Sequence, residues 1–211
     1  METQYTIPLG DYNMSNTIVS LNLTINMIDH VKNYHNPGVY MAITLPYNYP
    51  PTTLSNHFNP SAAANASLLK NEPKTIFYAI MTVSAKDTPT FDWFVNTVSN
   101  DYYEEDIDHV VLLREFYIAA REHHIPLIKE EEVYTRGLGK RCLCLAMPYV
   151  IDYFNMDSAT TSIGLTANGG LQLFNYYTKA YGFSPLYNTR TSESMFMVTD
   201  LDTFMEHCHH G

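Results

Sequence analysis

The chain has 211 residues, of which 45% are hydrophobic and 16% charged, a balance typical of a folded globular protein rather than a disordered one. Its formal net charge of −10 argues against nucleic-acid binding, because neutralising phosphates requires a basic surface. The same charge would attract a cationic partner such as an amine. Without internal repeats or linkers, residues 1–211 are expected to form one domain.

The cysteines and the N-terminus predict a cytoplasmic protein. Three cysteines, Cys142, Cys144 and Cys208, cannot all pair within one chain, and the first two are too close for a comfortable bridge. We therefore expect reduced thiols in a reducing compartment. The first residues lack the basic and apolar regions of a secretory signal. No segment reaches the ~18 consecutive apolar residues of a membrane span, so no membrane contact is expected.

The first half of the chain contains two clear strands. Val39–Leu45 and Thr75–Ser84 are predicted strands because both are rich in β-branched or aromatic residues. Thr17–Ile28 has apolar residues at both helical and strand spacing, so the choice stays open. Tyr47–Ala66, rich in Pro, Asn and Ser, is predicted to be a long surface loop. Phe91–Val98 is predicted to be a short helix or a strand.

The middle of the chain is less clear. His109–Ala120 fits a strand or a helix by periodicity, and its composition favours the strand. Arg121–Thr135 would then be an insertion; the alternative is that the strand is Pro126–Val133. Cys142–Phe154 has helical length, but Pro148 is expected to kink or end the helix.

The last quarter of the chain is predicted to form a strand, a helix and a second strand. Ser162–Ala167 is a predicted strand, and Leu171–Ala180 a predicted helix with an apolar stripe that ends at Gly182 as its C-cap. Ser194–Asp200 is the final predicted strand. His207–His210 is expected to be a frayed tail and not a metal site, since consecutive ligands rarely close a tetrahedral site.

A glycine-rich basic turn precedes the apolar segment that begins at Cys142. In Thr135–Arg141, two glycines stand between basic side chains, so the bare backbone can approach an anion. A helix starting there would point its first N–H groups at that anion, and the helix dipole would favour it. The alternative is a solvated turn between two elements.

The order of these elements over residues 110–205 resembles the C-terminal half of the GNAT superfamily of acyl-CoA N-acyltransferases. Arg136–Gly139 resembles the turn that holds the cofactor pyrophosphate, and Ile163–Asn168 resembles the strand and Asn-containing turn that follow. Leu173–Phe183 resembles the helix that closes the site with a Gly-Phe pair. Residues 1–108 show no clear family motif.

The resemblance implies an α/β (α+β) fold with a mixed, mostly antiparallel central sheet flanked by helices on both faces. It also implies transfer of an acetyl group from acetyl-CoA to a primary amine on a small molecule or peptide, by direct attack in a ternary complex. The cofactor-binding residues that it implies are Arg136, Gly137, Leu138, Gly139, Lys140, Arg141 and Asn168.

Acyl transfer to an amine needs a base, a polarised carbonyl and an acid. Glu115 is the first candidate for the base, followed by Glu122 and Glu132, because an amine is mostly protonated near neutral pH. Backbone N–H groups near Ile118–Ala120 would polarise the thioester carbonyl. Tyr177 is the candidate acid for the leaving thiolate. The alternatives are ordinary surface carboxylates and a tyrosine that packs in the core.

Three departures from the superfamily pattern support other functions. Arg141 stands where the turn usually ends in Gly or Ala, Pro148 interrupts the cofactor-binding helix, and Thr178 occupies the usual tyrosine position. A second hypothesis is therefore a catalytically degenerate GNAT-like binding or structural protein. A third is an unrelated α+β interaction protein, since Tyr-rich and Asn-rich loops suit a contact surface. The oligomeric state, monomer or homodimer, stays open.

Overall fold

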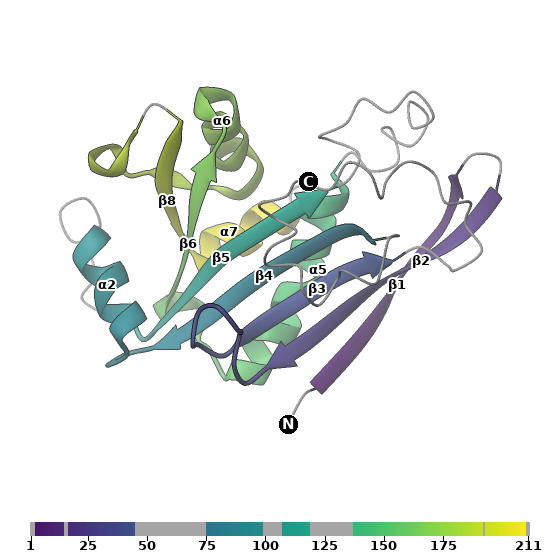
Figure 1. The fold of residues 1–211 in the computed structure, drawn as a ribbon, viewed down its shortest axis with the longest axis horizontal. Helices are drawn as coiled ribbons and strands as arrows, with labels where there is room; N and C mark the ends of the chain where they lie inside the picture. The colour runs from purple at the N-terminus through teal and green to yellow at the C-terminus, as the bar shows by residue number, and fades with distance from the viewer. Residues whose placement is uncertain are drawn as a thin grey trace.

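The structure, a computed structural model, describes residues 3–14, 17–44, 75–98, 107–118, 137–191 and 193–209. These residues form an eight-stranded, mostly antiparallel sheet with helices on both faces, as the sequence predicted (Figure 1). The strands are β1 (Thr3–Met14), β2 (Thr17–Ile28), β3 (Gly38–Thr44), β4 (Thr75–Ala85), β5 (His109–Ile118), β6 (Thr161–Asn168), β7 (Ser184–Pro185) and β8 (Ser194–Asp200). The helices are α2 (Pro89–Val98), α5 (Leu138–Phe154), α6 (Gly170–Tyr181) and α7 (Leu201–His209), with 3₁₀ turns η4 (Ser158–Thr160) and η5 (Tyr187–Thr189).

The described strands have the order β1-β2-β3-β4-β5-β6-β8-β7, and among them only the β5–β6 pair is parallel. Parallel neighbours need a crossover connection, and α5 lies within the segment that joins β5 to β6. A crossover helix runs back along the strands that it connects. The N-terminus of α5 therefore lies at the end of the sheet where β5 finishes.

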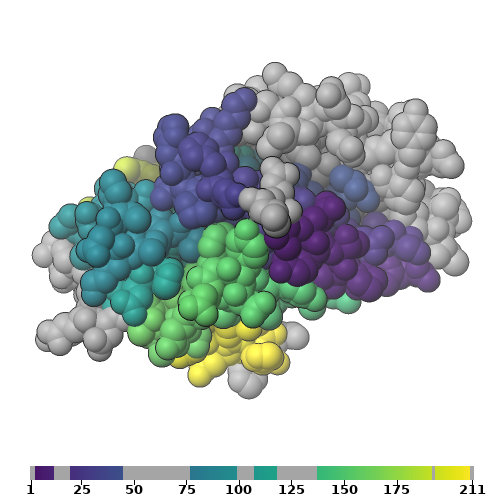
Figure 2. Space-filling view, turned by 90° about the horizontal axis from the view of Figure 1, so that it is seen from below, coloured from purple at the N-terminus to yellow at the C-terminus, as the bar shows by residue number. Residues whose placement is uncertain are grey.

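Two apolar clusters cover the two faces of the sheet. Alternation along β5 sends Val111 into the cluster that contains α5, α6 and α7, and sends Val110 and Leu112 into the cluster that contains α2. In Figure 2, α7 (yellow) lies at the bottom with α5 (green) over it, the β2–β3 segment (indigo) lies above them, and the teal atoms that include α2 lie to the left. The two faces of β5 are thus distinct environments.

Most predicted elements are confirmed, and Thr17–Ile28 is a strand. Its residues Leu21, Leu23, Ile25 and Met27 are buried on one face, with exposed fractions of 0–2%. Strand β1, which the sequence analysis missed, pairs with β2 along its length, and β3 pairs on the other side. These tertiary pairings decide between the two periodicities. The predicted loop Tyr47–Ala66 lies outside the described residues.

The sequence predicted that Pro148 kinks or ends its helix. Helix α5 continues through Pro148, so the proline does not end it. Pro148 is exposed, and it removes one backbone hydrogen bond from a 17-residue helix. The opposite side of α5 packs into the core. That packing outweighs the local cost. The buried residues of α5 are Leu138, Gly139, Cys142, Leu143, Ala146, Met147 and Val150.

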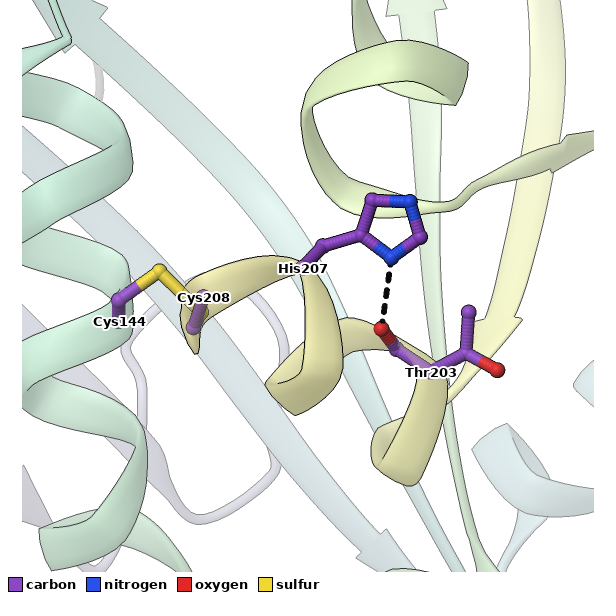
Figure 3. The surroundings of a disulfide bond; sticks show 4 residues. All are labelled: Cys144, Thr203, His207 and Cys208. Atoms are coloured by element: carbon purple, nitrogen blue, oxygen red, sulfur yellow. Dashed lines mark hydrogen bonds between the residues drawn. A yellow bond between two sulfur atoms is a disulfide. The ribbon is translucent and has the colours of Figure 1, made fainter. Parts of the chain in front are cut away.

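The cysteine prediction is also corrected. Cys144 of α5 and Cys208 of α7 form a disulfide with a Cα–Cα distance of 5.4 Å, across 64 residues of sequence (Figure 3). The expected frayed tail is helical up to His209, and His207 Nδ1 lies 2.9 Å from the carbonyl oxygen of Thr203 (Figure 3). Because two of the three cysteines are paired, the cysteines give no reason to expect a reducing compartment. No helix in the described part of the chain is long and apolar enough to cross a lipid bilayer.

Candidate functional site

The parallel strands β5 and β6 separate part-way along their length. Their ladder runs from the His109–Thr161 pair to the Leu113–Leu165 pair, whereas β5 continues to Ile118 and β6 to Asn168. Figure 1 shows the two strands diverging toward opposite sides beyond this point. A strand edge that loses its neighbour can accept an extended ligand as a substitute strand. This split is the centre of the candidate site.

A β-bulge lies in β5 where the split begins. Met81 of β4 faces Leu113 and Ile80 faces Glu115, so Arg114 is the extra residue. Arg114 Nε donates a hydrogen bond to Thr82 Oγ1 at 3.0 Å. Bulges redirect side chains and are frequent beside active sites. Here the bulge sends both Arg114 and Glu115 to the face of the sheet opposite α5.

Tyr34 contacts both of these side chains from the β2–β3 loop. Its hydroxyl lies 3.4 Å from Glu115 Oε1, to which it can donate, and the Arg114 guanidinium carbon lies 4.9 Å from the centre of its ring. Burial and the nearby Glu115 charge raise the pKa of Tyr34, with Arg114 opposing them. The phenol therefore stays protonated and remains a hydrogen-bond donor at neutral pH.

The loop that carries Tyr34 is held in place on the sheet. Asn36, which is buried, donates to Ser84 Oγ of β4 at 3.1 Å and accepts a hydrogen bond from Thr90 Oγ1 of α2 at 3.1 Å. Figure 1 shows this loop in front of the sheet and α5 behind it. Tyr34 is therefore positioned before any ligand arrives. Tyr34 could not be recognised from the sequence, because only the fold brings it to Glu115, 81 residues away.

The glycine-rich turn does open a helix. Gly137 has φ 79°, a left-handed conformation that glycine adopts without strain, and it is the N-cap of α5. The first helical hydrogen bond runs from the Arg141 N–H to the Gly137 carbonyl at 2.9 Å. The N–H groups of Leu138, Gly139 and Lys140 precede that bond and so have no partner within the helix. They point outward from the positive end of the helix dipole, as an anion site requires.

The side chains of this turn differ in their surroundings. Leu138 and Gly139 are buried, whereas Lys140 is half-buried. Arg141 is exposed, and its Nη2 donates to the Leu9 carbonyl oxygen of β1 at 3.1 Å. Its side chain is thus directed toward β1. Arg136 lies outside the described residues, as do Glu122, Glu132 and residues 119–120.

Tyr177 and Glu115 lie on different faces of the sheet. The Tyr177 ring is 8% exposed and contacts the rings of Tyr181 and Phe183 in the cluster on the α5 side. This is the packing arrangement that the sequence analysis gave as its alternative, and the role of Tyr177 as an acid stays a prediction. Asn168 is exposed at the end of β6, next to the split.

The cysteines are not available as nucleophiles. Burial raises the pKa of Cys142 to about 12, although the nearby Arg141 charge opposes the shift. Cys144 is bound in the disulfide. Because the thiolate is the reactive form, neither residue can start covalent catalysis near neutral pH.

No model of a known protein family matches this sequence, and a search of curated proteins also gives no match. Any assignment of function therefore rests on the split, the bulge and the glycine-capped helix.

Proposed function

We propose that this protein is a GNAT-type N-acyltransferase that moves an acetyl group from acetyl-CoA to a primary amine. The observation that carries the proposal is the divergence of β5 and β6 after the Leu113–Leu165 pair, at the end of the sheet where α5 begins. The superfamily that residues 110–205 resemble receives its cofactor in a split of this kind. The sheet order and the glycine-capped helix support the same proposal.

In this proposal the cofactor and the amine reach the split from different sides of the sheet. The N–H groups of Leu138, Gly139 and Lys140 bind the cofactor pyrophosphate, aided by the positive end of the α5 dipole. The arm that carries the thioester extends along β5 beyond the Leu113–Leu165 pair, where β6 no longer accompanies it. Glu115 faces the opposite side, so the amine approaches from the face that carries the Tyr34 loop.

The reaction is a direct transfer. Glu115, alone or through water, takes a proton from the ammonium, and the free amine attacks the thioester carbonyl. A carbon–nitrogen bond forms, the carbon–sulfur bond breaks, and the CoA thiolate leaves with its electron pair, while the attacking nitrogen gives up its second proton to water. The thiolate then takes a proton from Tyr177 or from water. The hydrogen bond from Tyr34 holds the Glu115 carboxylate in one orientation.

The second candidate function is a GNAT-like binding module without catalysis. The burial of the Tyr177 ring among other aromatic rings favours it, because a packed phenol is poorly placed to meet a thiolate.

Calorimetric titration with acetyl-CoA tests the proposal. We expect micromolar binding that Lys140→Glu weakens at least about tenfold, because the new carboxylate repels the phosphates beside the start of α5. Lys86→Glu is the matched control, since it makes the same charge change at an exposed site in the turn before α2. No heat from the folded protein would refute acyl-CoA binding and with it the N-acyltransferase, and would leave a binding module as the better account.

Catalysis is tested separately. Glu115→Gln should lower kcat by about 10²–10⁴ while the affinity for acetyl-CoA is unchanged, because the variant loses the base and not the cofactor site. Full cofactor binding with no transfer to any amine, even by the native protein, would favour the binding module.

A further inference from the structure

Arg114 is a half-buried cation to which no carboxylate of the described residues is bound. Its polar contact is the hydrogen bond from Nε to Thr82 Oγ1, and its guanidinium lies over the Tyr34 ring. Within the described residues, no carboxylate pairs with Arg114. Burial lowers the pKa of Arg114, because the charged guanidinium is less well solvated there than in water. Buried charges in proteins are normally compensated, so a cation that finds no counter-ion among the described residues is a candidate site for an anionic ligand group.

Arg114 and Glu115 share Tyr34 as a neighbour. The two residues are consecutive at the bulge and lie on the same face, where β5 loses its β6 neighbour. Tyr34 contacts both, with its ring against the guanidinium and its hydroxyl toward the carboxylate. The site therefore presents a positive group and a negative group side by side at the mouth of the split.

We infer that the acceptor carries a carboxylate close to its amine, as an amino acid does, with the ammonium at Glu115 and the carboxylate at Arg114. A planar guanidinium matches a carboxylate in charge and geometry. A simple amine or polyamine would leave Arg114 without a partner and would be repelled by it. The inference rests on the proposed function for the reaction of the amine. It replaces the cationic acceptor that the net charge of −10 suggested with one that carries both charges.

Matched pairs of ligands test the inference without requiring catalysis. A panel of common amino acids and their decarboxylated amines, such as lysine with cadaverine and histidine with histamine, is titrated by calorimetry. Each pair differs only in the α-carboxylate. We expect at least one amino acid to bind about 10–100-fold more tightly than its amine, the range of a hydrogen bond to a charged group.

Two variants connect the preference to Arg114. Arg114→Gln should remove the preference by weakening the amino acid alone, whereas Arg190→Gln, the same change at an exposed site after η5, should preserve it. Tyr34→Phe retains the ring beneath the guanidinium but loses the hydroxyl that contacts Glu115. It should keep the carboxylate preference in binding and lower kcat of transfer.

The outcomes separate this inference from the proposed function. Equal or tighter binding of the decarboxylated amines, or binding of neither class, would overturn the inference. A preference that survives Arg114→Gln would also overturn it. Acetylation of amines regardless of a carboxylate would leave the N-acetyltransferase standing and remove only the amino-acid acceptor. Amino-acid binding that depends on Arg114, together with no acetyl-CoA binding, would remove only the acetyltransferase.

Discussion

The disulfide between α5 and α7 makes a strong prediction about stability. The bond joins the helix that begins at the glycine-rich turn to the last helix of the described chain (Figure 3). Cys208→Ser breaks the bond and changes only one atom at the edge of the core. We expect the variant to fold but to unfold at lower denaturant concentration and lower temperature than the oxidised native protein.

The size of the effect follows from the length of chain that the bond closes. For 64 residues, the loss of loop-closure entropy in the unfolded state gives a stabilisation of about 4 kcal/mol. In a protein of this size, such a change lowers Tm by roughly 10 °C. Urea unfolding followed by circular dichroism measures the free energy directly.

Reductant supplies the matched control for this prediction. It should lower the stability of the native protein to that of Cys208→Ser and leave the variant unchanged. Thiol titration of the unfolded, unreduced protein should find one thiol, that of Cys142. Three thiols, or equal stability with and without reductant, would refute the disulfide and restore the expectation of reduced cysteines.

Three further predictions concern stability. Pro148→Ala should stabilise the protein by up to about 3 kcal/mol in urea unfolding, because Pro148 is exposed inside a continuous helix; a loss of stability would contradict this. Gly182→Ala should lower the free energy of unfolding by about 1–3 kcal/mol, and by more than Gly137→Ala does. Both glycines have positive φ, but only at Gly182 would a Cβ lie 2.6 Å from Thr203 Cγ2. Equal losses in the two variants would show that neighbouring atoms move away from the new Cβ. Burial raises the pKa of Cys142 to about 12 in the folded protein. As the pH rises, the thiol therefore ionises in the unfolded state before it does in the folded state. The free energy of unfolding should then fall by up to about 1.4 kcal/mol per pH unit above pH 9. The Cys142→Ala variant should lack that fall, and an identical pH dependence in both proteins would contradict the assignment.

Local sequence patterns were sufficient for several elements. Dense β-branched and aromatic residues predicted β4, and a similar run predicted β8 with its observed bounds, Ser194–Asp200. The helix α6 and its C-cap Gly182, with φ 77°, were also predicted, because a stripe of apolar residues followed by glycine is a local signal. These features depend on residues that are close in sequence.

Other elements required the rest of the molecule. Thr17–Ile28 satisfied both periodicities, and pairing with β1 and β3 made it a strand. Helix α7 was missed because its position depends on packing against α5 and α6 rather than on a strong local pattern. The helix-breaking effect of Pro148 is local, whereas the packing of the buried face of α5, which the sequence did not show, depends on the rest of the fold.

By itself, the sequence determined the candidate chemistry: a basic glycine turn that can begin a helix, and Glu115 on a strand before it. Only the tertiary structure decided which groups meet. The bulge at Arg114 turns two charges to one face, and the fold brings Tyr34 to them from 81 residues away. It likewise pairs Cys144 with Cys208. Residue type and spacing fix local conformation, whereas such distant contacts depend on strand order and register, which are set by packing of the whole chain.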